Sequence, residues 1–239
     1  MQVPAPGRIA SLLAARVPLV LLLCLTLLVG ACGGLRKDEP PEYYTVRTGD
    51  TLYSIGWRHR LDYRDIARWN GIGRDYRIYV GQRLRLRPPP GGVAPRAPTR
   101  PPPPATVRPP PKTLPPAPPW TWPVLGGRVA GSVKQPSGSV GLRIDGALGQ
   151  PVLAAADGKV VYTGTGLHGY GVVIIINHAN GWLTAYGHNA TVEVGEGDAV
   201  RAGQRIATMG EGVGQQPMLY FEIRIEGAPV DPLTQLPRR

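Results

Sequence analysis

The sequence is poor in cysteine, in phenylalanine and in charge. Its 239 residues include two Cys and one Phe, and only 18% of them are charged. Two cysteines exclude both a disulfide framework and a zinc site built from Cys ligands. Gly and Pro are abundant instead: 32 Gly and 28 Pro make up about a quarter of the chain, too large a share for one compact helical domain. The composition predicts a proline-rich spacer joined to a turn-rich β domain.

Charged residues are almost absent from the N-terminus. Arg8 and Arg16 are the only ones before Arg36, and an apolar run of 13 residues spans 17–29. A spanning helix needs about 20 apolar residues, so this length suits the core of a secretory signal. The run ends in Leu-Val-Gly-Ala before Cys32, which resembles a bacterial lipobox.

The lipobox resemblance implies a lipoprotein signal peptide over 1–31, lipidation of Cys32 and a lipidated tether over 32–42. Several acyl chains together anchor a protein stably. Gly rather than Asp follows the cysteine, which implies sorting to the outer membrane of a Gram-negative cell, facing the periplasm. An ordinary signal peptide with an incidental cysteine is the alternative.

Acidic residues are absent from 76–144, which contains 11 basic residues. The whole chain carries a formal charge of +11, and such an excess favours a polyanionic partner. An exported, lipid-anchored chain does not meet chromosomal DNA, so we predict no nucleic acid partner. Lipid head groups, teichoic-like polymers and the carboxylates of peptidoglycan are the candidates.

Residues 43–87 predict a small β-α-α-β module. An apolar strand pattern at 44–46 is followed by helical spacing from Leu52 to Ile55, a second helix over 63–69 and a strand over 80–86. Asp50 is placed to cap the first helix. The motif Val-x-x-Gly-Asp-Thr-Leu at 46–52, together with Asn70 and Gly81, resembles a LysM domain.

The LysM resemblance implies binding of glycan strands of peptidoglycan that contain N-acetylglucosamine. The glycan groove would lie between the loop after the first strand and the loop before the last strand. For each single residue a structural role is the alternative, since Asp50 can be a cap and Leu52 a core residue. The implied groove residues are Gly49, Asp50, Thr51, Leu52, Asn70, Gly71 and Ile72.

A Pro-rich linker is predicted over 88–119. This segment has 16 Pro, four basic residues and no acidic residue, so it cannot bury a core and should be disordered and extended. At about 3.1 Å per residue it would reach about 100 Å. A proline-rich ligand for an aromatic groove is the alternative.

Residues 120–239 predict an all-β antiparallel domain. Asp-Gly at 157–158 and Asn-Gly at 180–181 indicate hairpins. In 218–224, Leu219 and Phe221 alternate with Met218 and Tyr220, as the two faces of a strand do. Segments at 122–123, 149–152, 154–161, 186–188 and 221–222 resemble the lysostaphin/LytM-type zinc peptidases of cell-wall hydrolysis.

The resemblance implies that the zinc ligands of this family are missing here. Ser139 stands at the position of the first His, Arg143 at that of the Asp, and Tyr220 at that of the last His. Zinc prefers imidazole, thiolate or carboxylate donors, and an arginine has no lone pair to offer. The family's non-ligand catalytic His survives as His188, but alone it activates no metal-bound water. We therefore predict no metal, no cofactor and no catalytic residue.

The altered cleft becomes a candidate docking groove for another polypeptide. Tyr, Arg and Met are enriched where proteins bind one another. The alternative is that these side chains merely fill the space of a lost site. The residues expected to converge are Arg143, Tyr186, His188, Met218 and Tyr220.

Lipobox, LysM module, spacer and degenerate peptidase domain together resemble the NlpD-like murein hydrolase activators. The resemblance implies a non-catalytic activator of a periplasmic N-acetylmuramoyl-L-alanine amidase, which acts in peptidoglycan splitting and cell separation at the septum. Two alternatives stay open. One is an active LytM-type endopeptidase with non-standard metal ligands, and the other is a structural membrane-to-wall tether.

Overall fold

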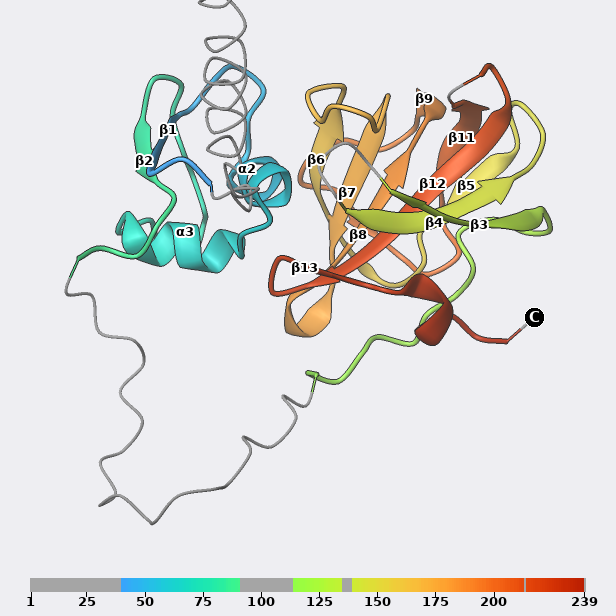
Figure 1. Cartoon of the computed structure of the whole chain (residues 1–239). Helices are drawn as coiled ribbons and strands as arrows, with labels where there is room; N and C mark the ends of the chain where they lie inside the picture. The colour runs from blue at the N-terminus through green and yellow to red at the C-terminus, as the bar shows by residue number, and fades with distance from the viewer. Residues whose placement is uncertain (1–39, 91–113, 135–138, 213, 239) are drawn as a thin grey trace, which may run out of the picture. The chain divides into compact units, whose positions relative to one another are not determined.

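Strands make up most of the described regular structure, and the two α-helices lie near the N-terminal end of the described chain (Figure 1). Two short 3-10 helices, Ala179–Gly181 and Pro232–Thr234, lie in the C-terminal domain. The structure is a computed structural model and describes residues 40–90, 114–134, 139–212 and 214–238. The predicted signal peptide, Cys32 and most of the predicted tether and linker lie outside these residues. In the described ranges, no helix is long and apolar enough to cross a membrane.

The N-terminal module has the predicted β-α-α-β order. Strands β1 (Tyr43–Thr45) and β2 (Arg83–Arg85) pair antiparallel and flank helices α2 (Leu52–His59) and α3 (Tyr63–Trp69). Thr51 caps α2, because its hydroxyl accepts a hydrogen bond from the Ser54 amide. In return, the Ser54 hydroxyl accepts one from the Thr51 amide. The expectation that Asp50 caps α2 is therefore wrong.

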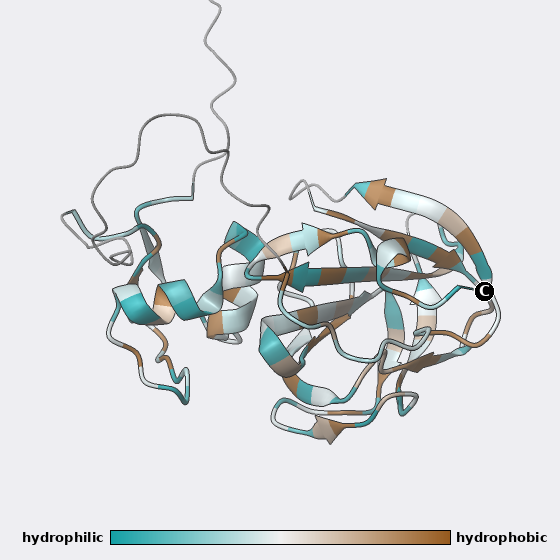
Figure 2. Cartoon of the chain, turned by 90° about the horizontal axis from the view of Figure 1, so that it is seen from below, coloured by the Kyte–Doolittle hydropathy of each residue, from teal (hydrophilic) through white to brown (hydrophobic). Residues whose placement is uncertain are grey.

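The C-terminal domain is the predicted antiparallel β domain. Its main row of strands has the order β10-β6-β7-β8-β12-β4-β3, and β5 and β9 pair with β11 to form a second layer. The alternation of hydrophobic and hydrophilic residues along the strands can be followed in Figure 2. The strands are β3 (Arg128–Lys134), β4 (Val140–Asp145), β5 (Pro151–Leu153), β6 (Gly158–Gly164), β7 (Val173–Asn177), β8 (Trp182–Gly187), β9 (Asn189–Val192), β10 (Ala199–Val200), β11 (Arg205–Glu211), β12 (Pro217–Ile225) and β13 (Ala228–Val230).

The longest strand, β12, separates two apolar clusters. Leu219, Phe221 and Ile223 point into the core between the two layers. Met218 and Tyr220 point to the opposite face, where they share a second cluster with residues of the N-terminal module. The predicted division of this strand into two faces is confirmed, and the second face is the one on which the peptidase-like positions lie.

The chain joins the β domain before the predicted start at residue 120. The Pro116 carbonyl accepts hydrogen bonds from Asn180 Nδ2 at 2.9 Å and from Trp182 Nε1 at 3.1 Å. The last residues of the predicted spacer are therefore fixed to the domain.

Candidate functional site

The N-terminal module contributes one side of an open groove of about 770 Å³. The turn into α2 supplies Asp50, Thr51, Leu52 and Tyr53, and the loop before β2 supplies residues 74–78. The β domain closes a further side with residues 159–161 and 196–197. The two loops are the ones between which a LysM module is expected to hold glycan.

Several of the predicted glycan residues have structural roles that occupy their side chains. Leu52 is 1% exposed and belongs to the module's core, and Thr51 caps α2. Asn70 joins the end of α3 to β2: its Nδ2 donates to the carbonyls of Ile66 and Arg85, both at 2.8 Å, and its Oδ1 accepts from the Arg85 amide at 2.7 Å. Asn70 is thus a structural clamp.

The remaining predicted glycan residues do not line the groove. Gly49 and Gly71 are exposed turn residues with φ of +80° and +64°, and Ile72 packs against the module's core. Sequence reasoning missed Tyr53 and Tyr76, which do line the groove. Tyr76 has φ of +53° in an irregular loop, and such a loop offers no periodicity that would reveal its orientation.

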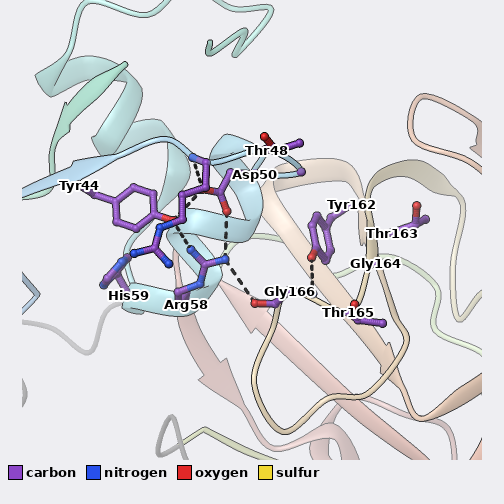
Figure 3. Close-up of a pocket in the computed structure, with 12 residues that line it drawn as sticks. Tyr44, Thr48, Asp50, Arg58, His59, Tyr162, Thr163, Gly164, Thr165 and Gly166 are labelled. Atoms are coloured by element: carbon purple, nitrogen blue, oxygen red, sulfur yellow. Dashed lines mark hydrogen bonds and ion pairs between the residues drawn. The ribbon is translucent and has the colours of Figure 1, made fainter. Parts of the chain in front are cut away.

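A second cavity, of about 590 Å³, adjoins the module (Figure 3). Asp50 lies at its centre and accepts hydrogen bonds from the Tyr44 hydroxyl at 2.7 Å and from Arg58 Nη2 at 3.0 Å. Arg58 also donates to the Gly166 carbonyl of the β domain at 3.4 Å. Burial lowers the pKa of the neighbouring His59, and the Arg58 charge lowers it further. Burial therefore favours the neutral form of the His59 imidazole, and Tyr44, Asp50 and Arg58 line the cavity as a hydrogen-bonded polar cluster.

The peptidase-like positions meet where β4 lies beside β12. Arg143 is opposite Tyr220, and Asp145 is opposite Met218 in the antiparallel register. Opposite residues share a sheet face. We call this surface the site face and define it by Ser139, Arg143, Met218, Tyr220, Glu222 and Arg224.

Two of the three predicted ligand positions hold side chains that are bonded to other protein groups. Ser139 is fully buried, and its Oγ accepts a hydrogen bond from Arg224 Nη2 at 2.5 Å. Arg143 Nε donates to Asp145 Oδ1 at 2.6 Å. This bond lowers the pKa of the Asp145 carboxyl, so the pair is charged and mutually satisfied at neutral pH.

The third ligand position, Tyr220, is fully buried and donates its hydroxyl proton to Glu222 Oε2 at 3.0 Å. Tyr170 donates to the same oxygen at 2.8 Å. Burial, followed by the charge of Glu222, raises the pKa of both phenols, so neither offers a phenolate. The side chains at these three predicted positions do not fit the zinc ion that the resemblance to LytM-type peptidases would imply. Among the described residues, no group of three or more His, Cys, Asp or Glu side chains could hold a metal ion.

Arg224 lies at the centre of this network and is 0% exposed. Its Nε donates to Glu222 Oε1 at 2.6 Å, and its Nη1 donates to the Trp57 carbonyl of α2 at 2.7 Å. The guanidinium also lies 3.8 Å from the centroid of the Trp57 ring, a cation–π geometry. The buried charge is thus paired on the β domain and covered by the N-terminal module.

Of the five residues expected to converge, the structure places Arg143, Met218 and Tyr220 on the site face. Tyr186 lies in the core between the layers, where its hydroxyl accepts a hydrogen bond from the Ala155 amide. Its register partner is Phe221 rather than Tyr220, so it points away from the site face, and the expectation for Tyr186 is wrong. His188 follows β8 directly and is half-buried with φ of +61°, and burial lowers its pKa.

Comparison with known proteins gives two domain matches and several relatives that align with most of the chain. The LysM domain model matches residues 44–87 and the peptidase family M23 model matches 137–232. Lipoprotein YgeR of Escherichia coli is 37% identical over 92% of each chain, and the NlpD/LppB homolog of Pseudomonas aeruginosa is 40% identical over 82% of this chain and 77% of the relative. The murein hydrolase activator NlpD of Escherichia coli is 35% identical over 82% of this chain and 68% of the relative. The chain therefore belongs to the family of bacterial lipoproteins that join a LysM domain to a peptidase family M23 domain and includes NlpD.

Proposed function

We propose that the chain is a non-catalytic activator of periplasmic N-acetylmuramoyl-L-alanine amidases in peptidoglycan splitting and cell separation. The observation that carries the proposal is the state of the three ligand positions. Ser139, Arg143 and Tyr220 each use their polar atoms on neighbouring protein groups, and none of the three is a good zinc donor. Relatives that are 33% and 35% identical to this chain are named murein hydrolase activators.

The partner surface that we propose comprises Arg143, Met218, Tyr220 and His188. Arg143 is half-buried on this face, and it can pair with an acidic partner group beside Asp145. Activation requires that the chain bind the open amidase more tightly than the closed one, because equal affinity for both states shifts no equilibrium.

Two features would determine where the activator lies in the cell: the predicted lipid on Cys32 and the LysM domain. Lipidation of Cys32 would hold it at the outer membrane, facing the periplasm, and the LysM groove would hold peptidoglycan glycan strands. Several relatives are named lipoproteins, one of them the outer membrane antigenic lipoprotein B of Haemophilus influenzae, which supports the anchor. Septal position would follow from the amidase and the glycan bound there.

The test uses dye-labelled sacculi, a purified amidase and the chain from residue 33 onward. The chain alone should release no dye and contain no stoichiometric zinc, whereas the chain with its amidase should release dye faster than the amidase alone. Arg143→Ala should weaken the stimulation, and Arg201→Ala, an exposed arginine outside the site face, is the matched control. Hydrolysis by the chain itself would establish an enzyme. Unchanged cell separation in the Arg143→Ala strain would favour a tether.

A further inference from the structure

One aromatic residue of the LysM domain lies on the side of its helix that faces away from the domain's own core. Successive residues of an α-helix are about 100° apart, so Trp57 lies about 200° around α2 from Ile55. Ile55 is 0% exposed within the LysM core. Trp57 would therefore be exposed in an isolated LysM domain, yet it is only 3% exposed.

The β domain supplies the cover for this side chain. The Arg224 guanidinium lies over the indole ring, and the Tyr170 ring meets it edge to face with centroids 6.3 Å apart. Arg224 also donates to the Trp57 carbonyl at 2.7 Å. This carbonyl lies in the last turn of α2, where it also accepts a 3.4 Å hydrogen bond from the Arg60 amide and where a positive charge is favourable.

Two glycines of the β domain allow the close approach of the two domains. A Cβ added at Gly227 would lie 2.6 Å from the Leu61 carbonyl carbon and 2.7 Å from the Asp62 amide nitrogen, in the connection between α2 and α3. A Cβ added at Gly181 would lie 2.3 Å from Arg64 Nη2. At Gly181 the added atom would meet only the flexible end of the Arg64 side chain, whereas at Gly227 it would meet backbone atoms. The docking therefore includes a close backbone approach at Gly227 besides the Trp57–Arg224 contact.

We infer that the LysM domain is the resident occupant of the site face: it docks through Trp57 onto Arg224 and must leave before an amidase can bind there. The inference rests on the proposed function for the identity of the competitor, but the docking itself is independent of it. Met218, Tyr220, Glu222 and Arg224 are all less than 5% exposed in the docked arrangement. Arg224 is the site-face residue that the LysM domain contacts directly, so a partner that binds Arg224 finds it covered.

The test uses the chain from residue 33 onward and three substitutions. Trp57→Ala removes the indole from the LysM side. Gly227→Asn inserts a side chain from the β-domain side, and asparagine tolerates the φ of +76° at that position. Tyr79→Ala is the matched control, because Tyr79 is an aromatic residue of the same domain that is 65% exposed.

Small-angle X-ray scattering measures the docking, and amidase-dependent release of dye from sacculi measures access to the face. We expect both opening variants to have a larger radius of gyration than the wild type. When the concentration of the chain limits the rate, both opening variants should stimulate the amidase about fivefold or more above the wild type. The reason is that loss of a buried Trp weakens docking by at least this factor. The control should match the wild type in both measurements.

A wild type already as expanded as the two variants would overturn the inference, as would expanded variants that stimulate no better than the wild type. If no form of the chain stimulates any amidase while the two variants still expand, the proposed function fails and the docking stands. Circular dichroism of each variant establishes that it is folded before either measurement is compared.

Discussion

The buried ion pair between Arg224 and Glu222 predicts that removing either charge alone lowers the free energy of unfolding. Removing the second charge from a chain that already lacks the first should raise it again. Both side chains are 0% exposed. Arg224→Met leaves the Glu222 carboxylate with the Tyr170 and Tyr220 hydroxyls on Oε2 and no donor from Arg224 on Oε1. Removing one partner of a buried pair costs roughly 3–5 kcal/mol, because the other charge stays buried without compensation. Arg224→Met should therefore lower the free energy of unfolding by about that amount.

A second substitution separates charge from packing. Glu222→Gln should destabilise the wild-type chain, because it leaves Arg224 as the uncompensated charge. In the Arg224→Met chain the same change removes the lone carboxylate and should restore about 2 kcal/mol. Urea denaturation followed by tryptophan fluorescence measures all four chains as a double-mutant cycle. If Glu222→Gln lowers stability equally in both backgrounds, the two charges do not interact as described and the reasoning fails.

Three further predictions concern other parts of the chain. Tyr220→His alone should bind no stoichiometric zinc, whereas the triple variant with Ser139→His and Arg143→Asp should bind close to one equivalent by elemental analysis. A triple variant that stays metal-free would contradict the assignment of the ligand positions. The pKa of His178 is lowered to about 4 by burial, so the unfolded chain binds the extra proton, and stability present above pH 6.5 should fall by about 3 kcal/mol towards pH 4. Acid titration of the denaturation midpoint measures this fall, which His178→Gln should flatten. Asn70→Ala loses three hydrogen bonds and should cost the LysM domain about 3 kcal/mol in the same denaturation assay, and a loss below 1 kcal/mol would refute the clamp.

The sequence predicted the two folds well because the decisive signals are local. The helix over 63–69 and the two faces of the strand through Tyr220 follow from spacing alone. The cap of α2 was assigned one residue early, since Asp50 and Thr51 are both good capping residues. What decided between them is tertiary: Tyr44 and Arg58 bind the Asp50 carboxylate, and spacing does not reveal such partners.

The site was predicted less completely than the fold. The substitutions at the ligand positions were evident, but the partners that fill their place were not, because Arg224 reaches Ser139 across 85 positions of sequence. Tyr186 is predicted on the site face but points into the core, because the alternation along β8 places it opposite Phe221 rather than Tyr220. The role of Trp57 depends on its contact with Arg224, 167 positions away in the sequence. Helical spacing indicates only that the Trp57 side chain lies away from the core of its own domain.

Gly141 determines where the Tyr220 ring can lie on the site face. An atom in the Cβ position of residue 141 would sit 2.4 Å from Tyr220 Cζ and 2.6 Å from its hydroxyl oxygen, so the phenol ring rests directly on the glycine backbone. The ring stands where the resemblance to zinc peptidases would imply an imidazole, and it leaves no room for a side chain at position 141. Because Tyr220 is 0% exposed, a partner can reach the ring only after the groups that cover it have moved. A methyl group at position 141 would displace the ring from its place on the backbone.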